Sequence, residues 1–128
     1  MMINILIVAI GGGIGAASRY LVSSWAAERF GSGFPYGTLI VNVAGCFIIG
    51  LFLALVTDKI VVKPEWRLFV TTGFLGGLTT FSSFSYETMK LLQEADISLA
   101  VYNVLANCVI GFLATWVGIN FARYLTLS

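Results

Sequence analysis

The chain has 128 residues, of which 59% are hydrophobic and only 10% are charged. Soluble domains carry roughly a quarter charged residues, so this composition excludes a water-soluble fold and indicates a surface covered by lipid. The formal net charge of +1 gives no electrostatic basis for a nucleic-acid partner. The sequence has no histidine, the commonest general base and metal ligand, and we do not expect an enzyme.

Four apolar runs are each long enough to cross the hydrocarbon layer, for which a helix needs about 20 residues. They cover approximately residues 3–22, 37–56, 68–91 and 98–125. A β-barrel is excluded because the alternation that its strands need is absent. No basic residue precedes the first run, as a secretory signal would normally require, so we expect the first helix to be retained. The sequence therefore predicts an all-α integral membrane protein, one domain over residues 1–128, whose neighbouring helices are antiparallel.

Glycines dominate the middle of the first run, in the string GGGIGA at residues 11–16. Their spacing matches a dinucleotide-binding loop, but no strand–turn–helix unit surrounds them. We interpret them as positions where helix backbones pack closely, since lipid supplies no hydrophobic drive for helix association. Arg19, near the end of the run, either extends to the membrane interface or attracts anions at a pore mouth, and the residues leave both roles open.

The second run carries one polar amide, Asn42, and small residues such as Gly45 and Gly50 that suit close packing. A single four-helix unit of this size has little room for a polar pathway, so we expect a dimer or a larger assembly. The small residues favour the same interpretation. Cys46 in this run and Cys108 in the fourth lie deep in apolar sequence. We interpret both as packing residues, and no disulfide or metal site is implied.

The third run is unusually polar for a membrane helix. Between Leu68 and Tyr86, seven residues are Ser or Thr and three are Gly. The pair Gly76–Gly77 followed by Thr79–Thr80 predicts a helix break, because glycine adopts open dihedrals and hydroxyls satisfy freed backbone groups. Broken helices at membrane depth line a cavity or are buried in protein, and their released carbonyls can coordinate a small cation. The break therefore indicates transport.

Aromatic and hydroxyl side chains alternate after the break. Phe81 and Phe84 share one helical face, and Ser82 and Ser85 form the neighbouring stripe. Core packing is the alternative explanation for such a Phe pair. Positive ring edges together with hydroxyl donors suit a small anion stripped of water, so the pattern indicates an anion pathway.

The fourth run has a polar track, in which Asn103, Asn107, Gly111 and Thr115 recur every four residues on one face. Hydrogen bonds between helices are an alternative use of this track. No Asp or Glu lies inside the first, second or fourth run. Because proton-coupled exporters usually carry a membrane-buried acid, the neutral track favours passive conduction of an ion.

Basic residues are nearly balanced between the two sides of the predicted membrane domain. Four lie on one side and three on the other: Lys59, Lys63, Arg67 and Arg123 against Arg19, Arg29 and Lys90. An excess of positive loop charge normally orients a membrane chain, so this near tie predicts that copies insert both ways up. A single orientation determined by one or two residues is the alternative.

Three motifs resemble those of the Fluc, or CrcB, fluoride channels: GTLIVN at 37–42, GFLGGLTTFSSFSYE at 73–87, and GGIG at 12–15 before Arg19 and Tyr20. The similarity extends over almost the whole chain, and the third-run motif is the most specific. The resemblance implies an antiparallel, dual-topology homodimer with two fluoride pores and a structural sodium ion at the dimer centre. It also implies passive export of fluoride from the cytoplasm by a multi-pass protein of a bacterial inner (plasma) membrane.

The resemblance also implies roles for residues at matching motif positions. Phe81 and Phe84 would line the fluoride path. Further polar residues would lie along or beside it: Asn42, Ser82, Ser85, Asn107 and Thr115. Gly76 and Thr79 would supply the backbone carbonyls that bind sodium, and Arg19 would lie in the vestibule.

Two other classes of function fit part of the sequence. A small multidrug exporter shares the four helices, the short loops and possible dual topology. Proton-coupled exchange needs a membrane-buried acid, however, and Glu87 falls near the end of the third run. A non-conducting scaffold subunit would use the polar stripes only for contacts between helices.

Overall fold

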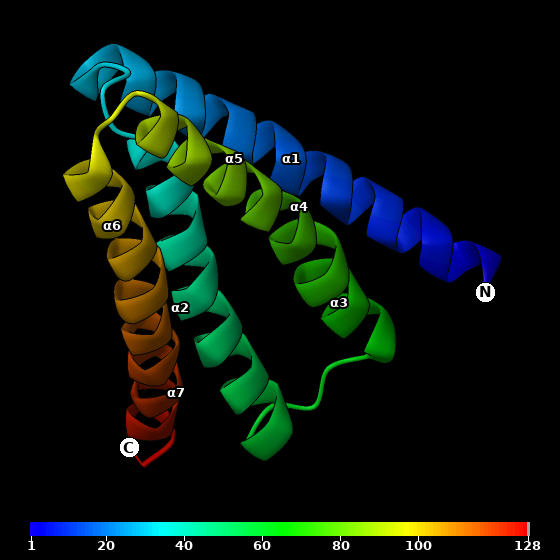
Figure 1. Ribbon diagram of the computed structural model, residues 1–128. Coiled ribbons are helices and arrows are strands. Elements are labelled where there is room, and N and C mark those ends of the chain that lie inside the picture. Colours follow the sequence, from blue (N-terminus) through cyan, green and yellow to red (C-terminus); the bar gives the residue numbers. More distant parts are fainter. Residues whose placement is uncertain (128) are drawn as a thin grey trace.

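A computed structural model describes residues 1–127, which form helices joined by short loops (Figure 1). The first two membrane segments are single helices, α1 (Met2–Phe30) and α2 (Tyr36–Asp58). The third is divided into α3 (Pro64–Leu68), the π-helix η1 (Phe69–Leu75), α4 (Gly76–Leu78) and α5 (Phe81–Gln93). The fourth is continuous and contains α6 (Ile97–Leu105), the π-helix η2 (Ala106–Ile110) and α7 (Gly111–Leu127). The predicted all-α fold with four helical segments and a broken third segment is confirmed.

Three helical stretches within residues 1–127 are long and apolar enough to cross a membrane: Met2–Phe30, Tyr36–Asp58 and Ile97–Leu127. The third segment does not qualify because its helix is interrupted after Leu78. The first helix is longer than predicted and continues beyond residue 22 to Phe30. It ends at Gly31, whose φ of 82° is a conformation that glycine adopts without steric cost.

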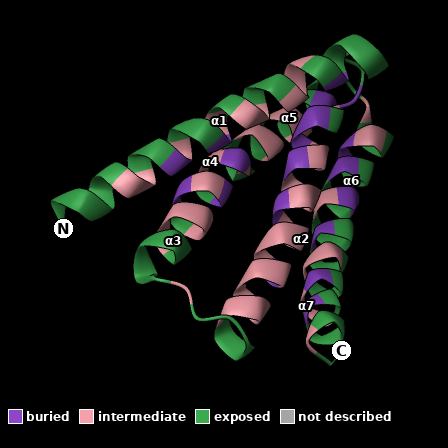
Figure 2. Cartoon of the chain, turned by 180° about the vertical axis from the view of Figure 1, so that it is seen from behind, coloured by how far each residue is buried: buried purple, intermediate pink, exposed green. Residues whose placement is uncertain are grey.

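Consecutive segments run antiparallel, as the short connections predict. The loops at residues 31–35 and 94–96 lie together at one end of the molecule, and the loop at 59–63 lies near the chain's C-terminal end at the other (Figure 1). Large apolar side chains on the outer faces are exposed, among them Ile10 and Trp116. Figure 2 shows buried residues only as patches along the helices, mainly where the helices face one another. This distribution is typical of a protein whose surface is covered by lipid.

Glycines allow α1 to pack directly on the backbone of the third segment. Gly11 and Gly15 are buried in this contact. A Cβ atom added to Gly11 would lie 2.7 Å from the carbonyl oxygen of Phe69 and 3.1 Å from the Cα of Gly73. The packing interpretation is therefore confirmed for Gly11 and Gly15 of the 11–16 string, and among residues 1–127 no strand surrounds the string.

The same contact predicts opposite effects for two glycine substitutions. A Cβ atom at Gly77 would meet the backbone of Gly12 and lie 3.0 Å from the amide nitrogen of Ala16, whereas one at Gly13 would meet nothing within 4 Å. We expect Gly77→Ala to destabilise the protein by about 1–3 kcal/mol, the usual cost of overpacking. Gly13→Ala should be neutral or stabilising by up to about 1 kcal/mol, from helix propensity. Unfolding in detergent micelles measures both, and equal stabilities would contradict this account of the contact.

Candidate ion pathway

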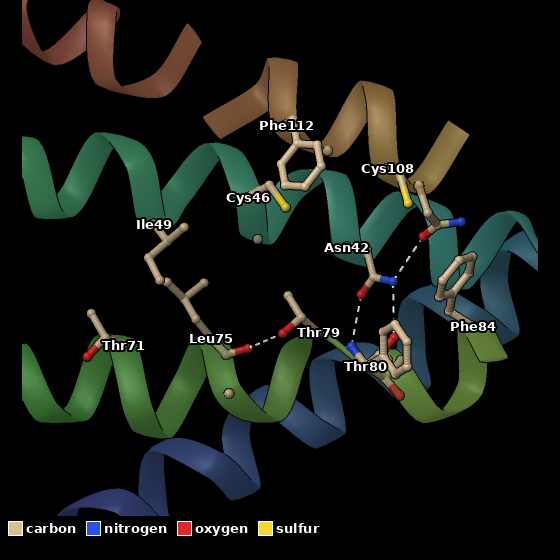
Figure 3. Close-up of a pocket in the computed structure, with 15 residues that line it drawn as sticks. Asn42, Cys46, Ile49, Thr71, Leu75, Thr79, Thr80, Phe84, Cys108 and Phe112 are labelled. Atoms are coloured by element: carbon tan, nitrogen blue, oxygen red, sulfur yellow. Dashed lines mark hydrogen bonds between the residues drawn. The ribbon is translucent and has the colours of Figure 1, made fainter. Parts of the chain in front are cut away.

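Three cavities follow one another along α2. The central cavity has a volume of about 520 Å³ and lies between α2, the broken third segment and η2 (Figure 3). A second, of about 500 Å³, opens at Thr38 near the start of α2 and includes Glu87 of α5. A third, of about 370 Å³, lies beside the last turns of α2 and includes Thr115 of α7. Ile49 borders both the central and the third cavity, so these two are adjacent.

The helix break in the third segment borders the central cavity. Thr79 (φ −85°, ψ 158°) and Thr80 (φ −152°, ψ 121°) are both extended. The Oγ1 of Thr80 accepts a hydrogen bond from the N–H of Ser83 at 3.1 Å and so caps the start of α5. Both threonines and both phenylalanines of the motif line the cavity.

The break begins later than the sequence predicted. Gly76 is helical (φ −61°, ψ −36°), and Gly76 and Gly77 together belong to α4. Gly77 serves close packing against Gly12, which requires a small residue but no unusual dihedral. The chain leaves the helix at Thr79 instead, since β-branched side chains favour extended backbone.

Side chains from two other segments pair with the backbone freed by the break. Asn42 Oδ1 accepts from the N–H of Thr80 at 2.8 Å, and Asn42 Nδ2 donates to the carbonyl of Thr80 at 3.1 Å. Arg19 Nε donates to the carbonyl of Gly77 at 3.0 Å. Buried backbone groups need such partners in lipid, so Asn42 and Arg19 stabilise the break itself.

The carbonyls of Gly76 and Thr79 do not receive their usual helical hydrogen bonds. The N–H four residues after Gly76 belongs to Thr80 and donates to Asn42. The N–H four residues after Thr79 belongs to Ser83 and donates to the hydroxyl of Thr80. Both Gly76 and Thr79 border the central cavity. Carbonyl oxygens are the ligands that hard cations prefer, so the chemistry of these two residues fits the sodium site that the family resemblance implies. That site stays a prediction.

The aromatic pair lies at the same cavity. The rings of Phe81 and Phe84 have centroids 5.6 Å apart and an interplanar angle of 68°, an edge-to-face arrangement. Phe81 is 78% exposed in the single chain, and Phe84 is half-buried. The pair is therefore not packed inside the chain's own core, which disfavours the core-packing explanation.

The other predicted site residues divide between the cavities and the surface. Asn107 lines the central cavity and accepts a hydrogen bond from Asn42 at 3.0 Å, so the polar track does join neighbouring helices. Thr115 lines the third cavity. Ser82 and Ser85 are exposed and border none of the three cavities of the single chain. Their place on the pathway, like the vestibule role of Arg19, stays a prediction.

Sequence reasoning missed three features of the cavities. Cys46 and Cys108 line the central cavity, although both were predicted only to pack. The sulfur of Cys46 lies 3.4 Å from where a Cβ of Gly111 would be, and so occupies the gap in the polar track. The hydroxyl of Thr38 donates to Glu87 Oε1 at 2.6 Å. Helical spacing could have indicated Thr38 and Cys46, because each lies four residues from Asn42 and so shares its face of the helix.

Comparison with known proteins gives consistent matches over nearly the whole chain. A family model described as "CrcB-like protein, Camphor Resistance (CrcB)" matches residues 6–119. A protein of Geobacter metallireducens, named "Fluoride-specific ion channel FluC", is 46% identical over 97% of this chain and 100% of its own length. Proteins of the same name from Solibacter usitatus and Clostridium perfringens are each 45% identical, over 92% and 94% of this chain and 97% and 94% of their own.

These relatives have nearly the same length as this chain, and the matched residues include all four helical segments and the break between Leu78 and Phe81. The three apolar helices and the exposed apolar surface agree with a multi-pass protein of a bacterial membrane. The chain belongs to the CrcB-like family, whose curated members are named fluoride-specific ion channels.

Proposed function

We propose that the protein is a fluoride-selective channel that passively exports fluoride from the cytoplasm. The observation that carries this proposal is the row of cavities along α2. The helix break borders the central one, which is lined by Phe81, Phe84, Asn42 and Asn107. No Asp, Glu, Lys or Arg is among the residues that line the central cavity. A neutral lining lets an ion pass down its gradient without a fixed charge to trap it. The relatives are named ion channels, which supports a conduit and not an enzyme.

The chemistry around the break suits a small anion. α5 begins at Phe81, so the positive end of its dipole and its first N–H groups lie at the central cavity. The edges of the two Phe rings carry partial positive charge. Fluoride is strongly hydrated and gives up water only to close donors, and a narrow passage lined by such groups discriminates against the larger chloride.

We propose in addition that a structural sodium ion is held between two antiparallel copies. Gly76 and Thr79 offer two carbonyl oxygens per chain at the cavity. Two ligands are too few for a hard cation, which takes about six or more oxygens, so an equivalent pair from a second copy and waters would complete the shell.

The near balance of basic residues supports insertion in both orientations. Reporters fused to the C-terminus should give signals from both compartments, and a one-sided signal would contradict dual topology.

A proton-coupled multidrug exporter is the alternative in a different class, and Glu87 of α5 is the carboxylate considered for the proton carrier. Glu87 borders the second cavity, is half-buried and accepts the hydroxyl of Thr38. It lies outside the central cavity. The relatives are named channels, which does not favour this alternative.

Flux through reconstituted protein tests the proposed function. Purified protein is placed in liposomes loaded with potassium fluoride, and efflux is started with a potassium ionophore and followed with a fluoride electrode. We expect rapid fluoride efflux, much slower chloride efflux from matched potassium chloride liposomes, and no dependence on a proton gradient. Equal rates for the two anions, or no efflux, would overturn the assignment.

A further inference from the structure

Three asparagines form a continuous series of hydrogen bonds beside the central cavity. The N–H of Thr80 donates to Asn42 Oδ1 at 2.8 Å, as Figure 3 shows, and Asn42 Nδ2 donates to Asn107 Oδ1 at 3.0 Å. Asn107 Nδ2 donates in turn to Asn103, at both its side-chain Oδ1 and its backbone carbonyl, each at 3.0 Å. The series thus crosses from the start of α5 to α2 and then to the fourth segment.

The series then returns to the helix from which it started. Asn103 Nδ2 donates to Thr88 Oγ1 at 2.9 Å, and Thr88 Oγ1 donates to the carbonyl of Phe84 at 2.8 Å. Thr80 caps α5 and Phe84 carries a cavity-lining ring, so both ends of the series act on the first turns of α5. We call the five residues Thr80, Asn42, Asn107, Asn103 and Thr88 the asparagine relay.

Two backbone groups determine which end of each amide points along the relay. The N–H of Thr80 can only donate, so it selects the oxygen of Asn42, and the carbonyl of Asn103 can only accept, so it selects the nitrogen of Asn107. Asn42 Nδ2 also donates to the carbonyl of Thr80, so both of its hydrogens are used. All bonds along the relay therefore run in one direction, and aligned hydrogen bonds strengthen one another where the dielectric is low.

Asn103 anchors the relay without bordering the pathway. Its exposed fraction is 0%, and it lines none of the three cavities, whereas Asn42 and Asn107 line the central one. We propose that Asn103 is a positioning residue for ion discrimination, which holds Asn107, Asn42 and the first turns of α5 so that the central cavity keeps one width. This inference rests on the proposed channel function. A passage of fixed width favours fluoride, because chloride is the larger ion.

Matched Asn→Leu variants test the proposal in the reconstituted full chain. Asn103→Leu keeps the side-chain size but removes the anchor. Asn120→Leu is the control, because Asn120 makes a comparable bond to the carbonyl of Trp116 at 2.8 Å and lies outside the relay and the cavities. We expect the ratio of fluoride to chloride flux to fall about tenfold in Asn103→Leu, the change that corresponds to one or two hydrogen bonds. The ratio should be unchanged in Asn120→Leu.

A second pair of variants keeps the proposal testable if Asn103→Leu does not fold. Thr88 is less buried than Asn103 and closes the relay through its hydroxyl. Thr88→Val should lower the flux ratio in the same direction, and Thr88→Ser, which keeps the hydroxyl, should retain the wild-type ratio. If both single variants fold, the double variant Asn103→Leu/Thr88→Val should have the same flux ratio as Asn103→Leu alone, because both changes interrupt the same series of hydrogen bonds.

The outcomes separate this inference from the proposed function. No fluoride flux in the wild-type protein would overturn the channel assignment itself. Wild-type fluoride flux together with unchanged selectivity in Thr88→Val, or with equal losses in Thr88→Val and Thr88→Ser, would overturn the positioning role of Asn103 and leave the channel intact.

Discussion

Asn42→Leu should lower fluoride flux by at least about 100-fold, which corresponds to roughly 2.7 kcal/mol. The leucine side chain has a similar size but can neither accept from the N–H of Thr80 nor donate to its carbonyl. Each backbone group left unpaired in a buried site costs about 1–3 kcal/mol. We expect the two extended residues to rearrange so that these groups find new partners, which would displace Phe81 from the pathway. Fluoride efflux from liposomes measures the loss, and unfolding in detergent measures the accompanying destabilisation.

Asn120→Leu is the control for this substitution as well, because it removes an asparagine from α7 that bonds only within its own helix. The assembly of each variant is checked by size-exclusion chromatography, so that lost flux is not confused with lost protein. Wild-type flux in Asn42→Leu would show that the pairing of Asn42 with the break is not needed for conduction.

The sequence was sufficient to predict four helical segments, three of which are long and apolar enough to cross a membrane, because hydropathy and length carry that signal. Their ends were less accurate. The first helix continues to Phe30 through Ala26 and Ala27, which are strong helix formers, and stops only at Gly31. An apolar run marks the part of a helix that lies in lipid, not the part that projects beyond it.

The break illustrates a second limit. The hydroxyl cap on Ser83 was predictable from local sequence, because Ser and Thr side chains commonly cap helix starts. The position of the break was not, because the role of Gly77 depends on α1, which lies far away in sequence. Arg19 is 58 residues from its partner Gly77, so the sequence suggested an interfacial or vestibule role and gave no indication of this contact.

The candidate site was predicted in its central part and not in its outer parts. Phe81 and Asn107 were identified by aromatic or polar spacing and Asn42 as the one amide of its run, and all three line one cavity. Periodicity also placed Ser82 and Ser85 on a stripe, and that stripe faces outward in the single chain. A helical period groups residues by face, but only the packing of neighbouring helices, or of a second copy, decides what each face contacts.

Phe81→Ile and Phe84→Ile, made singly, should each lower fluoride flux at least about tenfold while leaving the fold intact. Isoleucine is apolar and fills much of the same space, but it lacks a ring with a positive edge. Phe81 is 78% exposed in the single chain, so its replacement should change stability by no more than about 0.5 kcal/mol. A loss of flux without a loss of stability therefore reports on the ion and not on folding. Fluoride efflux and unfolding in detergent are measured on the same preparations.

Phe121→Ile provides the matched aromatic control. Phe121 of α7 forms a pair with Phe47 at a centroid separation of 6.3 Å, close to that of Phe81 and Phe84, yet neither ring lines the central cavity. Its substitution should leave fluoride flux unchanged. If ring chemistry at the cavity matters, the effect must be confined to Phe81 and Phe84. Equal effects in all three variants would assign the change to membrane packing. No effect at Phe81 and Phe84 would remove the aromatic pair from the mechanism. The hydroxyls and the start of α5 would then be the groups that replace water around the ion.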